Sequence, residues 1–234
     1  MEMNTNVATQ RLILKSKQVA VFDNFLSPED HFQILEHCNH AQYTPVHAHQ
    51  WRKVWRLRDG HPLQGSTVTH RPDSSALAAP TEPWAPFIRR LDEVLPTVTD
   101  VVGGPDTWVD VTIAPWIYPA GSGLSLHLDG MPHFAGSYTY FLHKNWNIHW
   151  GGLLLILDPE TALGSNRATG EHWIYDDEET LAALDPGTAL CIFPKPNRIV
   201  FVAPNAHHLI TRVDQSAGQN PRISIAGFFR RMND

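Results

Sequence analysis

The sequence contains few cysteines and lacks any long apolar run. Cys38 and Cys191 are its only cysteines, too few for a disulfide framework and without the spacing of a metal site. The longest conspicuous apolar run, residues 153–157, falls far short of the roughly 20 residues that cross a membrane. The N-terminus does not combine a basic segment with an apolar one, as a secretory signal would. We therefore expect a soluble protein of the reducing cytoplasm, with no membrane partner.

A strong excess of one charge is also missing, as are internal repeats, low-complexity segments and a Pro/Ser-rich linker. The formal net charge is −6, which argues against a nucleic-acid-binding surface. A length of 234 residues with 42% hydrophobic residues suits one domain with a sizeable core. We therefore predict a single domain over residues 1–234.

Short strand signals dominate the second half of the chain. Most are bounded by Gly, Pro, Asp or Asn, which is typical of an all-β sandwich or barrel. These predicted strands cover residues 108–118, 124–128, 137–143, 152–157, 171–175, 188–193, 198–203, 207–213 and 222–229. Two earlier strands are expected at 11–15 and 18–22, and one or two helical turns at 178–184.

Two helices are predicted before this β-rich half. The first begins after Ser27 as N-cap, with Pro28 at its first position, and its apolar positions are Phe32, Leu35 and Cys38. The second opens around residues 82–86 and carries an apolar stripe that ends at Pro96. Both helices are expected to support the β-structure from outside.

Residues 40–82 are rich in His, Pro, Gly, Ser and Thr and contain one strand-like stretch at 51–58. The favoured interpretation of that stretch is a half-buried strand with a solvated basic face. The alternative is that it reaches the mouth of an active site, where an arginine would hold an anionic substrate group. The whole segment, with its tryptophans, is a candidate lid.

A histidine and an aspartate lie two residues apart in the strand-like run 124–130. Successive strand residues point to opposite faces, so His127 and Asp129 share a face, which suits two ligands of one metal. A third ligand would complete a 2-His-1-carboxylate face for Fe(II). His207 and His208 are the well-placed donors downstream, and because they are adjacent only one of them can face the metal.

An arginine opens the last predicted strand. Arg222 and Ser224 lie on one face of a strand whose other residues are mainly apolar. A buried guanidinium needs a compensating anion, and its fork matches a carboxylate. The chain therefore combines a candidate iron site with a candidate carboxylate clamp.

These segments resemble the Fe(II)/2-oxoglutarate-dependent oxygenases, and within them the prolyl-4-hydroxylase-like group. The resemblance lies in residues 118–123 leading into His127-Leu128-Asp129, then 140–146, 150–152, His208 and Arg222. It implies a mainly β fold, a double-stranded β-helix (jelly-roll or cupin-like barrel) with supporting N-terminal α-helices. The jelly-roll core would span residues 105–230, and residues 1–104 would supply helices, strands and the candidate lid.

The resemblance also implies roles for particular residues. The distal histidine of the family is followed by aliphatic residues at the second and fifth positions, which favours His208, with Ile210 and Val213, over His207. The implied catalytic residues and metal ligands are thus His127, Asp129 and His208.

The implied cofactor-binding residues centre on Arg222, which would pair with the far carboxylate of 2-oxoglutarate. Arg212 is the competing clamp. Relatives carry a tyrosine that contributes to 2-oxoglutarate binding where this chain has Phe141, which cannot donate a hydrogen bond. We expect Tyr118 and Ser224 to compensate.

The activity implied is that of a dioxygenase that uses Fe(II), 2-oxoglutarate and O2, with ascorbate as a supporting reductant. It would hydroxylate an unactivated C–H bond and release succinate and CO2. A small amino-acid-like or natural-product substrate is favoured because the compact chain shows no added recognition domain. One alternative is a hydroxylase of prolyl or other residues in a protein or peptide. Another is a non-catalytic metal-binding jelly-roll protein, which would not need the clamp at Arg222.

Overall fold

The computed structural model describes residues 10–46, 59–71, 83–129, 133–159 and 187–231, together with residues 178, 182, 184 and 185. The predicted strands at 51–58 and 171–175 lie outside the described residues, as does most of the predicted helical segment 178–184. The same holds for residues 47–58 and 72–82 of the candidate lid.

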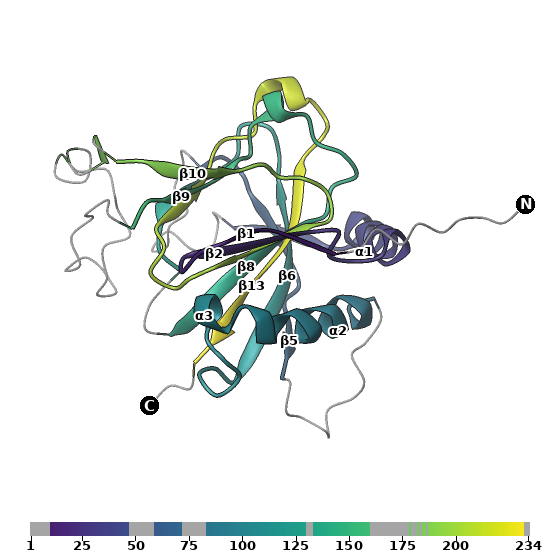
Figure 1. Cartoon of the computed structure of the whole chain (residues 1–234). Coiled ribbons are helices and arrows are strands. Elements are labelled where there is room, and N and C mark those ends of the chain that lie inside the picture. The colour runs from purple at the N-terminus through teal and green to yellow at the C-terminus, as the bar shows by residue number, and fades with distance from the viewer. Residues whose placement is uncertain are drawn as a thin grey trace, which may run out of the picture.

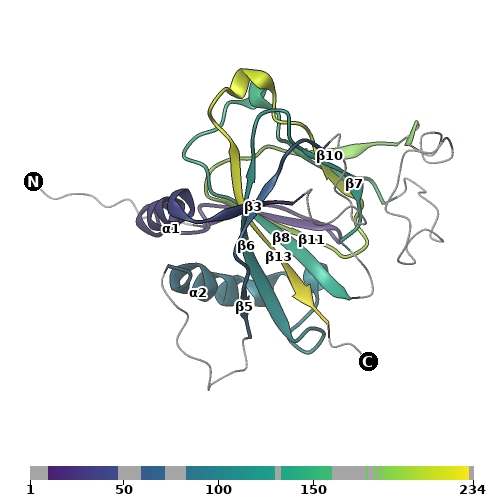
Figure 2. The same cartoon turned by 180° about the vertical axis from the view of Figure 1, so that it is seen from behind.

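Two antiparallel sheets lie one over the other (Figures 1 and 2). The larger has the strand order β1-β2-β11-β8-β13-β6-β4-β3, with β5 also paired to β6. Its strands are β1 (Arg11–Lys15), β2 (Val19–Asp23), β3 (Tyr43–Pro45), β4 (Leu63–Gly65), β5 (Val68–His70), β6 (Asp110–Tyr118), β8 (Phe134–Phe141), β11 (Arg198–Val202) and β13 (Arg222–Arg230). The smaller sheet has the order β10-β9-β12-β7, with β7 (Leu124–His127), β9 (Leu154–Leu157), β10 (Ala189–Ile192) and β12 (His208–Ile210). This confirms the mainly β, jelly-roll prediction.

Helices cover the face of the large sheet that points away from the small sheet (Figure 1). They are α1 (Pro28–His40), α2 (Ala85–Val94), which continues into a 3-10 turn at Leu95–Thr97, and α3 (Thr99–Val102). Two further 3-10 turns, Ile148–Trp150 and Gln215–Ala217, contact each other away from these helices. Ser27 caps α1 as predicted, because its side chain accepts a hydrogen bond from the Asp30 N–H. In the described part of the chain, none of the helices is long and apolar enough to cross a membrane.

One apolar residue of α1 lies outside the buried face of the helix. Phe32 is 56% exposed, whereas the buried face of α1 is formed by Ile34, Leu35 and Cys38. The phenylalanine lies one position off the stripe that these three residues form.

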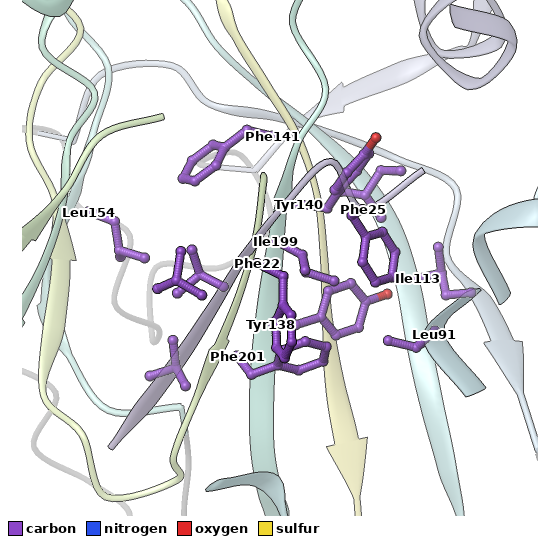
Figure 3. Packing of buried hydrophobic residues seen from close by; sticks show 14 of the residues in the cluster. Phe22, Phe25, Leu91, Ile113, Tyr138, Tyr140, Phe141, Leu154, Ile199 and Phe201 are labelled. Atoms are coloured by element: carbon purple, nitrogen blue, oxygen red, sulfur yellow. The ribbon is translucent and has the colours of Figure 1, made fainter. Parts of the chain in front are cut away.

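Alternation along β8 separates a structural core from the space between the sheets. Tyr138 and Tyr140 point toward the helices, with ring centroids 5.8 Å and 5.4 Å from that of Phe87 on α2. Figure 3 shows Tyr138 and Tyr140 on the side of Leu91 and Phe25, and Phe141 on the other side, toward Leu154. Successive strand residues face opposite ways, so the odd-numbered positions of β8 face the small sheet. The core that holds the helices is thus distinct from the space that holds the candidate site.

Phe87→Ala should destabilise the fold strongly. Its side chain is fully buried, and truncation of a buried phenylalanine typically costs about 3–5 kcal/mol through lost burial and an unfilled cavity. Phe32→Ala is the matched control, since an exposed side chain typically changes stability by less than about 0.5 kcal/mol. Urea unfolding followed by circular dichroism measures both. Equal losses in the two variants would contradict this assignment of the core.

Sequence interpretation missed three short strands between residues 40 and 82. β3, β4 and β5 have three residues each, too few for alternation to show. β4 and β5 pair with β6 and so extend the large sheet past the strand that carries Tyr118. The remaining described strands lie where the sequence predicted them, within a few residues at each end.

Candidate metal centre

Three side chains from the small sheet converge between the two sheets. His127 on β7 lies directly opposite His208 on β12, and directly paired strand residues share a face. Their ring centroids are 4.2 Å apart. Asp129, just beyond β7, places Oδ1 3.5 Å from His127 Nε2 and Oδ2 3.4 Å from His208 Nε2. One ligand atom from each of the three residues lies within 4.8 Å of the others.

Both imidazoles are held by a backbone carbonyl two residues earlier. His127 Nδ1 donates to Ser125 O and His208 Nδ1 donates to Ala206 O, each at 2.8 Å. A proton on Nδ1 leaves the lone pair on Nε2, the nitrogen that faces Asp129. Metal-binding histidines are typically oriented in this manner. The two rings are therefore set in the tautomer that a shared cation requires.

The charge state of the group also suits a cation. Burial would raise the pKa of Asp129, but His208 and His127, together with a hydrogen bond from the Ser137 hydroxyl, outweigh it and hold the pKa below its usual range. Burial lowers the pKa of His208, although Asp129 opposes this shift. An ionised carboxylate is the form that binds a metal ion. The donor set thus fits a 2-His-1-carboxylate iron site.

The structure separates His208 from its neighbour. His207 lies just before β12, its carbonyl accepts a hydrogen bond from Leu157 N at 2.9 Å, and it is not part of the group formed with Asp129. Burial is the main reason why the pKa of His207 is lowered to about 4. The geometry agrees with the choice of His208. Its role as a ligand stays a prediction.

Arg222 is fully buried at the start of β13, a strand paired on both sides. Its Nε donates to Gly152 O at 3.0 Å and its Nη1 to Ser224 Oγ at 3.3 Å. Its Nη2 has no hydrogen-bond partner among the described residues. Burial lowers the pKa of Arg222 to about 10, so the guanidinium stays charged at neutral pH. A buried cation with an unused donor fits a carboxylate ligand.

Two aromatic rings flank this guanidinium. Its Cζ lies 5.1 Å from the ring centroid of Tyr118 and 4.9 Å from that of Phe141. Both contacts are within cation–π range, so Phe141 keeps the stacking surface of a tyrosine while lacking its hydroxyl. Burial raises the pKa of Tyr118, against the opposing effect of Arg222, so its hydroxyl keeps its proton. The predicted cofactor-binding residues Arg222, Tyr118 and Ser224 therefore lie together.

The family resemblance included the Trp-Gly-Gly segment at 150–152, but the sequence alone did not show why residue 152 must be glycine. Its φ is +64°, and a Cβ there would lie 2.9 Å from Arg222 Cδ and 3.2 Å from Trp146 Cζ2. Only glycine fits both the backbone conformation and the space. Arg212, the competing clamp, has an exposed side chain, which leaves Arg222 as the buried cation of the site.

No protein-family model matches the sequence, and no curated protein is detectably similar to it. Solved structures of similar fold include two prolyl hydroxylases and an epimerase. A Pseudomonas putida prolyl-4-hydroxylase has 16% identity and a TM-score of 0.61, covering 92% of this chain and 93% of its own. A Trichoplax adhaerens prolyl hydroxylase in complex with a hypoxia inducible factor peptide has 13% identity and a TM-score of 0.56, covering 92% and 84%.

The third structure is the epimerase SnoN from nogalamycin biosynthesis, in complex with Fe3+, alpha ketoglutarate and nogalamycin RO. It has 12% identity and a TM-score of 0.55, covering 92% of this chain and 79% of its own. The chain therefore has the fold of the Fe(II)/2-oxoglutarate oxygenases, as the sequence predicted.

Proposed function

We propose that this chain is an Fe(II)- and 2-oxoglutarate-dependent dioxygenase, a hydroxylase built as one domain with its jelly-roll core in residues 105–230. The observation that carries the proposal is the pairing of two features between the sheets. One is the donor group of His127, Asp129 and His208, and the other is the buried guanidinium of Arg222 with an unused donor. The fold supports the same proposal.

In this proposal His127, Asp129 and His208 would hold the iron. When bound, Fe(II) would supply the oxidising chemistry, with O2 and 2-oxoglutarate as cosubstrates and succinate and CO2 as their products. The protein contributes the orientation of the ligands. The Ser125 and Ala206 carbonyls fix the two imidazoles, and the Ser137 hydroxyl fixes the carboxylate.

The far carboxylate of 2-oxoglutarate would bind at Arg222. Nη2 offers a free N–H, and burial between two rings keeps water from competing for it. Ser224 accepts from Nη1, so its own proton can be directed to the carboxylate. The Tyr118 hydroxyl is the further donor that would replace the one lost at Phe141.

We propose a small amino-acid-like or natural-product molecule as the substrate, a class to which the nogalamycin ligand of SnoN belongs. The second candidate is a prolyl or other residue in a peptide, and the peptide complex of the Trichoplax enzyme favours it. A metal-binding protein without turnover is disfavoured, because metal storage does not require a fully buried arginine with an unused donor.

A succinate-release screen tests the proposal. Purified protein would receive Fe(II), 2-oxoglutarate and ascorbate with separate pools of amino acids, other small metabolites and proline-containing peptides. We expect a small-molecule pool to raise succinate release and to yield a product heavier by one oxygen atom. Stimulation by the peptide pool alone would contradict the substrate class. Succinate release that persists without Fe(II) and in Asp129→Ala would contradict the enzyme class.

A further inference from the structure

Asp59 is a buried carboxylate that contacts β7 from a distant part of the sequence. Asp59 is only 4% exposed to solvent. Oδ1 accepts two hydrogen bonds from Ser125, one from the backbone N at 3.0 Å and one from Oγ at 2.5 Å. The main-chain carbonyl of Asp59 accepts a third from Gly123 N at 3.0 Å. Asp59 is thus attached to the start of the strand that carries His127.

That start of β7 is irregular. Leu124 lies opposite Ile210 and His127 lies opposite His208, so three steps on β7 match two steps on β12. The extra residue falls within Ser125–Leu126 and forms a bulge, which leaves backbone groups out of the ladder and redirects side chains. Both backbone groups of Ser125 form hydrogen bonds with side chains. Its N donates to Asp59, and its carbonyl accepts from His127 Nδ1 at 2.8 Å.

The segment around Asp59 is docked closely against the turn before β7. Gly60 has φ +77°, and a Cβ there would lie 2.7 Å from Gly121 O and 2.8 Å from Ser122 Cα. The next residue, His61, donates its backbone N–H to Ser122 Oγ at 3.0 Å. These backbone contacts leave the carboxylate of Asp59 little freedom to move. It is therefore a fixed acceptor for Ser125.

We propose that Asp59 is a positioning residue for the metal centre, acting through the hydrogen-bonded series Asp59–Ser125–His127. The inference rests on the proposed function, since it assigns a role at the same site. Without the carboxylate, the Ser125 N–H and hydroxyl lose their acceptor and the bulge can relax. The Ser125 carbonyl then no longer fixes Nδ1 of His127, and Nε2 loses its direction toward the metal. Partners of this kind typically contribute 10- to 100-fold in metal affinity.

The test compares metal binding by wild type and three variants with Co(II) as the probe, by calorimetry and by the ligand-field absorption of the bound ion. Asp59→Ala should weaken binding about 10- to 100-fold and alter the absorption. Asp59→Asn should retain most of the wild-type Co(II) affinity, because its amide oxygen can accept both hydrogen bonds. Ser125→Ala should lower the Co(II) affinity about three- to tenfold, because this variant keeps the backbone hydrogen bond to Asp59 and loses the hydroxyl.

Asp110→Asn is the matched control. Asp110 is 1% exposed and accepts from Arg230 Nε and Nη2 at 2.6 and 2.7 Å, on the large sheet and outside the metal group. This variant should lose stability while keeping the wild-type Co(II) affinity and absorption. A general structural effect of losing a buried carboxylate would instead lower metal affinity in both positions.

Three results would overturn the inference. These are wild-type affinity and absorption in folded Asp59→Ala, equal losses in Asp59→Ala and Asp110→Asn, and no recovery in Asp59→Asn. If Asp59→Ala does not fold, Ser125→Ala is the deciding variant. Wild-type Co(II) affinity in Ser125→Ala would then contradict the role of the hydrogen-bonded series Asp59–Ser125–His127. A wild-type protein that binds no Co(II) would instead reject the proposed function, so the two failures are distinguishable.

Discussion

His208→Ala is expected to abolish turnover while the fold stays intact. The substitution removes one of three ligand atoms that lie within 4.8 Å of each other, and no other donor group of the described residues replaces it. The core between the helices and the large sheet does not involve this side chain, so unfolding by urea should change little. Metal affinity by calorimetry and succinate release measure the two effects. The same loss is expected for His127→Ala and Asp129→Ala.

His207→Ala is the matched control for this prediction. It removes an adjacent imidazole of the same size that does not face Asp129. The variant should keep its metal and most of its turnover. Full activity in His208→Ala together with loss in His207→Ala would show that the wrong neighbour had been assigned.

Removal of the Arg222 guanidinium should raise the 2-oxoglutarate requirement strongly. Loss of one partner of a desolvated, charge-assisted contact costs about 2–5 kcal/mol, which corresponds to about 30- to several-thousand-fold in affinity. Arg222→Met keeps much of the volume between the Tyr118 and Phe141 rings, so the change reports on charge and hydrogen bonding more than on packing. Arg222→Lys should give an intermediate loss, because it retains the charge without the fork.

Arg212→Ala provides the control, since this arginine is exposed and its loss should change the 2-oxoglutarate affinity little. Calorimetric titration of 2-oxoglutarate into metal-loaded protein measures all four proteins. An unchanged affinity in Arg222→Met, with a large loss in Arg212→Ala, would assign the clamp to Arg212.

Local sequence patterns were sufficient for the parts of the site that lie on one strand. The parity of His127 and Asp129 follows from the two-residue period of a strand, and the geometry of the pair agrees with it. The burial of Arg222 follows from the apolar residues after it. Strand alternation could not show whether His207 or His208 is the third ligand, because it indicates only that the two side chains face opposite ways. The family resemblance made that choice.

Local sequence patterns alone could not predict how distant segments contact each other. The register that places His127 opposite His208 depends on a bulge in β7. The residue types in that segment do not indicate a bulge. Asp59 lies in a segment whose composition favours loops, and its contact with Ser125 joins residues 66 positions apart. Gly152 was part of a matched motif, but the approach of Arg222 that requires it became visible only in three dimensions.

The central claim is that one site binds a divalent metal and 2-oxoglutarate together. Calorimetric titration of 2-oxoglutarate into the protein tests it most directly, with and without Mn(II), which stands in for Fe(II) and resists oxidation. The claim predicts one 2-oxoglutarate per chain, bound tightly only with the metal, and strongly weakened in both Asp129→Ala and Arg222→Met. Binding that is equally tight without metal, or unchanged in these two variants, would contradict it.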